Sequence, residues 1–355
     1  MSVVGRKNHS HPRHSQSPSI RNQESRASRI SNCYSTPMPD CQSRISNLES
    51  RIRYNAYGRF LKERFGRRVY KISVDAGFSC PNRDGTVAVG GCIYCNNDSF
   101  RPRTASRLKS VSEQVREGIE FFRGRNHAEK FIVYFQPFTN THAPLEELIP
   151  LYEMALNHPD VVGISIGTRP DCIDEGKLAW LEKAASAHFV TLEYGLQSVY
   201  DTTLARIHRG HNFQCWLDAM QRTRGRGIRL CAHLILGFPW ETREEMLRTA
   251  EVISDKGLDF LKLHHLHVVR GTELENEYRA KPFPLLGLEE YADLVVDFLE
   301  RLSPDICIER LFGTAPKDQL IGPVWGKSKA EIQRTIEQRL ATRNAWQGRR
   351  VVGSR

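Results

Sequence analysis

Three cysteines stand close together in one glycine-rich stretch of this sequence. Cys80, Cys92 and Cys95 have eleven residues between the first two and two between the last two. Thiolates bind zinc and iron–sulfur clusters, so this spacing indicates a metal site. A structural zinc ion needs a fourth ligand from elsewhere, whereas an iron–sulfur cluster held by three cysteines keeps one iron open for a substrate or cofactor. Three thiols in one loop favour the open cluster over zinc, and also over a purely packing role.

The cysteine loop follows the first of six short apolar runs that alternate with amphipathic stretches. The runs predict strands over 69–75, 131–136, 161–167, 190–196, 229–237 and 260–269. The stretches predict helices over 110–123, 144–157, 174–187, 212–224, 242–256 and 288–302. This alternation is typical of a parallel sheet, either open and doubly wound or curled into a partial TIM-like barrel. In both, ligands bind where the carboxyl ends of the strands meet, so functional residues are expected just after each strand.

The composition is that of an ordinary folded protein. The chain has 355 residues, 40% hydrophobic and 26% charged, enough for one large or two medium domains with a buried core. No run approaches the ~20 apolar residues that span a bilayer, and the polar start lacks the apolar segment of a secretory signal. Nine cysteines, an odd number, fit reduced thiols or metal ligands better than disulfides. We therefore expect a cytoplasmic protein with no membrane partner.

The net charge of +10 is concentrated at the two ends of the chain. Residues 1–53 carry nine Lys or Arg against three Asp or Glu, and residues 327–355 carry eight against two. The middle of the chain is slightly acidic. Basic ends of a chain are typical of proteins that bind a polyanion such as RNA, and they are also typical of solvated tails that bind nothing. The sequence leaves both interpretations open.

The chain divides into three predicted parts. Residues 1–53 are rich in Ser and Arg and predict a disordered extension, which is functional, a targeting segment or the product of a start codon assigned too early. Residues 54–305 predict the core domain. Residues 306–355 predict a short C-terminal α/β extension, with a strand over 306–312 and a basic helix over 329–343.

The cysteine segment, with Cys92-Ile93-Tyr94-Cys95 at its end, resembles the signature of the radical SAM superfamily. Most members have three residues in the first gap, and the gap of eleven resembles the YhcC-like bacterial family. That family is similar to the radical SAM part of the elongator catalytic subunit. The resemblance extends through KISVDAGF at 71–78, YFQPFTNT at 134–141, GTRPDC at 167–172, EYGLQS at 193–198, HRGH at 208–211 and HLILGFP at 233–239. It implies a partial TIM-like (β/α)6 barrel.

The resemblance also implies the cofactors. Cys80, Cys92 and Cys95 would hold three irons of a [4Fe-4S] cluster, and S-adenosylmethionine (SAM) would chelate the fourth. Reduction of the cluster would cleave SAM to methionine and a 5′-deoxyadenosyl radical, which abstracts hydrogen from a substrate. The residues that would contact SAM are Tyr94, Gln136, Arg169, Glu193, Gln197, Arg209 and Gly237.

Several of these residues have a structural alternative. Tyr94 could instead shield the cluster from solvent, and Gln136 could instead cap a loop. Arg169 also suits a buried pair with Asp171. Gly237 also suits a strand-to-helix turn. The family motif that usually receives the SAM amino group, Gly-Gly-Glu, is matched poorly by Phe-Gln-Pro here.

Histidines lie on the fifth and sixth predicted strands. His265 and His267 share a strand face and His264 lies on the other, so a second metal is not expected. An inward histidine of this strand, or His233 on the preceding one, is expected to contact substrate or adenine.

The elongator-like resemblance implies a tRNA substrate with a modified wobble uridine. It also implies a cellular electron donor of the flavodoxin or ferredoxin kind. Two alternatives stay open. The first is a radical SAM enzyme that acts on a small metabolite or porphyrin. The second is a non-enzymatic RNA-binding protein that carries zinc or an iron–sulfur cluster.

Overall fold

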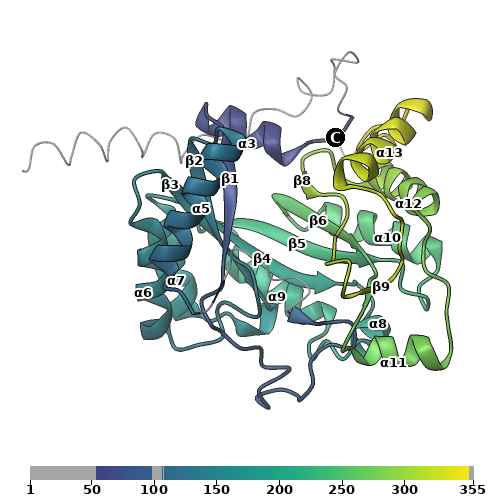
Figure 1. Cartoon of the computed structure of the whole chain (residues 1–355), viewed down its shortest axis with the longest axis horizontal. Helices are drawn as coiled ribbons and strands as arrows, with labels where there is room; N and C mark the ends of the chain where they lie inside the picture. Colours follow the sequence, from purple (N-terminus) through teal and green to yellow (C-terminus); the bar gives the residue numbers. More distant parts are fainter. Residues whose placement is uncertain (1–52, 98–105, 107, 352–355) are drawn as a thin grey trace, which may run out of the picture.

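The computed structural model describes residues 53–97, 106 and 108–351. Apart from Arg53, the extension predicted for residues 1–53 lies outside the described residues. The chain forms a curled parallel sheet with helices packed on its outer face (Figure 1).

The sheet contains seven parallel strands in the order in which they occur along the chain. Each new strand is added beside the previous one, so the sheet curls into a half barrel. The predicted partial TIM-like barrel is therefore confirmed. All six predicted strands are present, and the strand predicted at 306–312 adds a seventh beside β6. The bounds are β1 Val69–Val74, β2 Lys130–Phe135, β3 Val161–Thr168, β4 Phe189–Gln197, β5 Arg229–Leu236, β6 Phe260–His265 and β8 Cys307–Arg310.

The predicted helices are also present, with ends within a few residues of the prediction. Three of them begin with a full capping box, in which a Ser or Thr cap and the Glu three residues later bind each other's backbone N–H, as at Ser110 and Thr242. The box satisfies two of the free N–H groups at the start of the helix. The longer helices are α3 Tyr57–Phe65, α5 Val111–Asn126, α6 Leu145–Leu156, α7 Glu175–Ala185, α9 Phe213–Thr223, α10 Arg243–Ser254, α12 Leu288–Arg301 and α13 Lys329–Thr342. The short elements are η1 Pro170–Cys172, α8 Asp201–Arg206, α11 Glu273–Ala280, β7 Val268–Val269 and β9 Leu320–Gly322.

Helix α3 closes the amino-terminal end of the half barrel. Its Tyr57 and Phe60 are buried and pack against Phe260 of β6 and Phe189 of β4. The segment before α3 is bound to β8, because the Ile308 N–H donates to the Asn55 carbonyl at 2.7 Å. An apolar plug therefore fills this end, and the opposite end is left for polar residues.

The basic helix α13 lies on the acidic helix α12. Arg339 pairs with Asp293 and Glu289, and Arg343 pairs with Asp293 and Asp297. The positive charge of the C-terminal part is therefore largely engaged in ion pairs within the chain.

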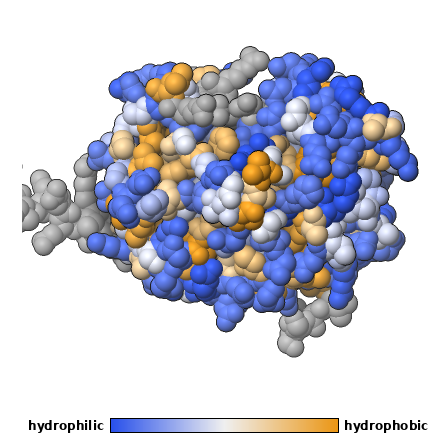
Figure 2. Space-filling model, turned by 90° about the horizontal axis from the view of Figure 1, so that it is seen from below, coloured by the Kyte–Doolittle hydropathy of each residue, from blue (hydrophilic) through white to orange (hydrophobic). Residues whose placement is uncertain are grey.

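Among the described residues, no helix has both the length and the apolar character needed to cross a membrane. Figure 2 shows that hydrophilic side chains predominate around the face seen from below, with hydrophobic ones gathered nearer its middle.

Gly163 of β3 lets this strand lie directly against β4. A Cβ atom at this position would stand 1.9 Å from the backbone oxygen of Phe189, which cannot move without moving β4. We expect Gly163→Ala to lower the free energy of unfolding by about 3 kcal/mol or more in a urea titration. Gly58→Ala is the control, since a Cβ there meets nothing within 4 Å. Equal stability of the two variants would contradict the packing described here.

Candidate active site

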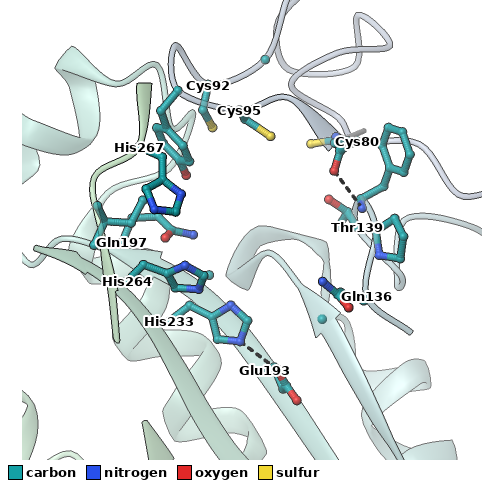
Figure 3. A pocket seen from close by; sticks show the side chains of 18 of the residues that line it. Cys80, Cys92, Cys95, Gln136, Thr139, Glu193, Gln197, His233, His264 and His267 are labelled. Atoms are coloured by element: carbon teal, nitrogen blue, oxygen red, sulfur yellow. Dashed lines mark hydrogen bonds and ion pairs between the residues drawn. The ribbon is translucent and has the colours of Figure 1, made fainter. Parts of the chain in front are cut away.

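The three cysteines of the predicted metal site line one cavity at the carboxyl end of the sheet. All three thiols are free, and Figure 3 shows their sulfur atoms directed into the same open volume. Cys80 follows β1, as predicted, and Cys92 and Cys95 return to it at the end of the loop. Burial, and next the neighbouring Cys92, raise the pKa of Cys95 to about 11. The thiol is therefore protonated at neutral pH until a metal displaces the proton.

The loop that carries the cysteines is fixed from several sides. The Val87 N–H donates to the Pro81 carbonyl at 2.8 Å, which folds the loop back on itself. The backbone of Ile93 forms hydrogen bonds to two helices: its N–H donates to the Ile207 carbonyl at the end of α8, and its carbonyl accepts from the Leu274 N–H at the start of α11. Gly91 has a φ of 92°, a conformation that L-residues rarely adopt. The sulfur positions are thus held by backbone contacts.

Two N–H donors face the Cys92 sulfur. Asn82 Nδ2 lies 3.5 Å from it and Arg209 Nη1 lies 3.7 Å from it. Asn82 is fully buried and also donates to the His208 carbonyl at 2.6 Å. The guanidinium of Arg209 donates to the Gly195 carbonyl, where a side chain would collide with it. These donors suit a sulfur that carries negative charge.

The cavity beside the cysteines has a volume of about 610 Å³. This lies within the range of about 300–1,000 Å³ found for small-molecule sites. Six of the seven predicted SAM contacts line it: Tyr94, Gln136, Arg169, Glu193, Gln197 and Arg209. The side-chain amide oxygen of Gln136 accepts a hydrogen bond from Ser73 Oγ at 2.8 Å, which fixes this side chain. Gln197 has a φ of 75° at the end of β4.

Arg169 and Gly237 have other surroundings. Arg169 lines the cavity, but its side chain is buried. Its Nε and Nη2 donate hydrogen bonds to the Asp171 carboxylate, and its Nη1 donates to the Arg209 carbonyl at 2.7 Å. Gly237 is not among the residues that line the cavity, and a Cβ there would meet Leu286 at 2.9 Å. Contact of either residue with SAM therefore stays a prediction.

Glu193 lies deeper than predicted, in the middle of β4, within a network of buried charges. Its Oε1 is 2.7 Å from Lys71 Nζ, and its Oε2 binds Lys262 Nζ. Glu309 joins both lysines, at 2.6 Å and 2.8 Å. Burial opposes the charge on Glu193, but Lys262 and Lys71 hold the pKa of its carboxyl well below the ordinary value. Two cations and two anions thus balance inside the barrel. A contact of Glu193 with the SAM ribose stays a prediction.

The histidines predicted near the site all line the cavity. His265 and His267 lie side by side, with their Nε2 atoms 2.7 Å apart, and His265 stacks on Trp325. His264 instead binds Arg310 from β8. This arrangement agrees with the shared face predicted for His265 and His267.

Comparisons with known proteins identify the family of this chain. The radical SAM superfamily model matches residues 83–253, and the radical SAM C-terminal domain model matches residues 258–342. The uncharacterized protein YtqA of Bacillus subtilis is 37% identical over 308 residues, which is 86% of this chain and 94% of YtqA. This chain belongs to the radical SAM superfamily. Protein YhcC of Escherichia coli is 36% identical over 276 residues, covering 78% of this chain and 88% of YhcC, so the predicted family is confirmed.

More distant relatives include a tRNA uridine(34) acetyltransferase of Methanocaldococcus infernus. It is 27% identical over 163 residues, which is 45% of this radical SAM chain and 29% of that protein. The structure of an N-terminally deleted Elp3 of the same organism superposes with a TM-score of 0.62. It has 17% identity over 79% of this chain and 64% of that chain, so this comparison shows the fold alone.

The cofactors of this enzyme family are a [4Fe-4S] cluster and SAM, as predicted. The residues present fit them. Three free thiols line one cavity, a set that would hold three irons of the cluster and leave the fourth open to SAM. When bound, the cluster and SAM supply a 5′-deoxyadenosyl radical. Membership of this family supports an enzyme over the non-enzymatic zinc or RNA-binding alternative.

Sequence analysis missed the charged layer and the donors to sulfur. Lys71, Lys262 and Glu309 stand on the strands β1, β6 and β8, and a charge on a buried strand was the available signal. The partners of Asn82 and Arg310 could not be predicted, because they lie 126 and 46 positions away in the chain.

The buried network predicts a large effect of neutralising Glu193. We expect Glu193→Gln to lower the free energy of unfolding by about 3–5 kcal/mol at pH 7, because it leaves a lysine uncompensated inside the barrel. Urea titration measures this change. The control is Glu129→Gln, whose partner Arg67 is exposed and whose loss should cost less than about 1 kcal/mol.

The same network predicts a pH dependence. Because the pKa of Glu193 is depressed in the folded state, its stabilisation is present above the ordinary value of 4.5 and declines as the pH falls below it. The gap in stability between the wild type and Glu193→Gln should therefore narrow in acid. A gap that stays constant would contradict the assignment.

The cysteine geometry predicts which thiols are needed. We expect Cys80→Ala, Cys92→Ala and Cys95→Ala each to lose bound iron and sulfide after anaerobic reconstitution, and to lose dithionite-dependent SAM cleavage. Cys215→Ala should match the wild type, since Cys215 does not line this cavity. Iron and sulfide analysis together with 5′-deoxyadenosine quantification measures both effects. Equal loss in all four variants would contradict the site.

Proposed function

We propose that this radical SAM enzyme modifies the wobble uridine of a tRNA. The observation that carries the proposal is the similarity to a tRNA uridine(34) acetyltransferase in sequence, together with the fold shared with Elp3. The proposed substrate would enter the cavity as an unpaired base, because an enzyme that acts on a base must take it out of the stack.

The electrostatics of the cavity support a phosphate-bearing substrate. Arg310 and Lys329 both line it, and neither forms an ion pair with a carboxylate of the described residues. The arginines Arg339 and Arg343, which are paired with α12, contribute little to such binding. Among the described residues, Arg310 and Lys329 at the cavity are therefore the cations that we assign to tRNA binding.

The remaining cavity residues have proposed roles in holding SAM. Tyr94, Gln136, Gln197 and Arg209 line the cavity that the cysteines also line, and we assign them to SAM binding. Arg209 also keeps its guanidinium at the Cys92 sulfur. A flavodoxin- or ferredoxin-like reductant in the cytoplasm completes the proposal.

The proposal predicts a change in bulk tRNA. In a strain that lacks the gene, nucleoside mass spectrometry should show a wobble uridine whose modification is incomplete. Expression of the wild-type enzyme should restore the wild-type profile, and expression of Cys92→Ala should not, because it lacks the cluster ligand.

An unchanged tRNA profile in the deletion strain would contradict the proposal. It would favour the alternative of a small metabolite or porphyrin substrate. A change that Cys92→Ala restores as well as the wild type would show that radical chemistry is not responsible.

A further inference from the structure

The inner end of the cavity, opposite the cysteines, carries a pair formed by Glu193 and His233. His233 Nε2 lies 2.7 Å from Glu193 Oε2. Figure 3 shows this pair at the bottom of the cavity, far below Cys92 and Cys95, so it is remote from the metal site. The ring of His233 comes from β5 and lines the cavity.

The charges around this pair fix which nitrogen of His233 carries the proton. Glu193 is an ionised carboxylate between Lys71 and Lys262, and a carboxylate only accepts hydrogen bonds. His233 Nε2 must therefore be the donor. Burial, together with the Lys262 charge, lowers the pKa of His233 to about 4, so the imidazole is neutral at pH 7. A neutral ring protonated at Nε2 has an unprotonated Nδ1.

The Nδ1 atom of His233 has no hydrogen-bond donor among the side chains and backbone groups of the described residues. The neighbouring His264 ring lies 6.2 Å away, centroid to centroid, and its Nε2 is engaged with Arg310. Figure 3 shows the His233 ring facing the open cavity. The pair thus presents one fixed acceptor to whatever occupies the inner end.

A metal ion does not explain the pair. Glu193, His233 and Cys231 place their ligand atoms within 4.8 Å of one another. However, Lys71 and Lys262 already neutralise Glu193, and burial raises the pKa of the Cys231 thiol well above its ordinary value. A divalent cation would meet two ammonium groups and a protonated thiol.

We propose that His233 Nδ1 accepts a hydrogen bond from a ring N–H of the substrate base and that Glu193 positions His233 for this contact. The inference rests on the proposed function, and under it the donor is the N3–H of uracil. Cytosine has an acceptor at the same ring position, so the contact selects uracil over cytosine. His233 is then a specificity-determining residue, and Glu193 is a positioning residue.

Two substitutions separate the acceptor from the contact with Glu193. The amide of His233→Gln reaches the position of Nε2 and keeps a donor for Glu193, but it removes the acceptor. The shorter amide of His233→Asn places an oxygen near the position of Nδ1. We expect His233→Gln to lower modification of bulk tRNA from the deletion strain by about 10- to 100-fold, the effect of one unsatisfied hydrogen bond. His233→Asn should recover part of the loss.

SAM cleavage without tRNA is the second measurement on the same variants. In both His233 variants SAM cleavage should fall by less than tRNA modification does, because the pair lies away from the cysteines. The control His188→Gln lies outside the cavity and should match the wild type in both measurements. Unchanged tRNA modification by His233→Gln would overturn the inference. A parallel loss of SAM cleavage, or an equal loss of modification in both variants, would overturn it as well.

A tautomer measurement tests the inference without tRNA. In protein labelled with 15N-histidine, the resonances absent from His233→Gln identify His233, and they should show a neutral ring protonated at Nε2. A ring protonated at Nδ1, or at both nitrogens, would overturn the inference. If the wild type leaves tRNA unmodified, the proposed function fails, while the tautomer result still decides whether the acceptor exists.

Discussion

The site depends on three thiols held toward one volume with N–H donors beside them. Cys80 leaves β1, and Cys92 and Cys95 come back to it through a loop that is bound to α8 and α11. Asn82 and Arg209 direct their donors at the Cys92 sulfur. A set of thiolates accumulates negative charge, and such donors stabilise that charge in a buried position. The remainder of the fold serves to bring these groups to one edge of the sheet.

The interior of the half barrel has three layers along its axis: an aromatic layer, a charged layer and the cavity with the cysteines. Aromatic residues of α3 fill the amino-terminal end, so water is excluded from below. Above them, Lys71 and Lys262 balance Glu193 and Glu309. This charged layer forms the floor of the cavity and sets the orientation of His233. The cysteines lie at the opposite end of the cavity, which leaves room for SAM and a substrate between the cysteines and the charged layer.

Much of the fold could be predicted because its signals are local. Apolar runs such as β3 mark buried parallel strands, and the Ser-x-x-Glu caps mark helix starts. The cysteine site was predictable for the same reason, since its ligands lie within one loop. The partners of Arg169, Glu193 and His233 come from other strands, so their contacts depend on strand order and register. The role of α13 was hidden likewise, because its basic residues find their partners on α12.

The central claim is that three cysteines hold a [4Fe-4S] cluster whose fourth iron is open to SAM. Electron paramagnetic resonance of the dithionite-reduced, anaerobically reconstituted protein, recorded with and without SAM, tests it most directly. The account predicts the signal of a reduced [4Fe-4S] cluster that changes when SAM is added. A cluster signal that SAM leaves unchanged, or a protein that takes up zinc and shows no such signal, would contradict it.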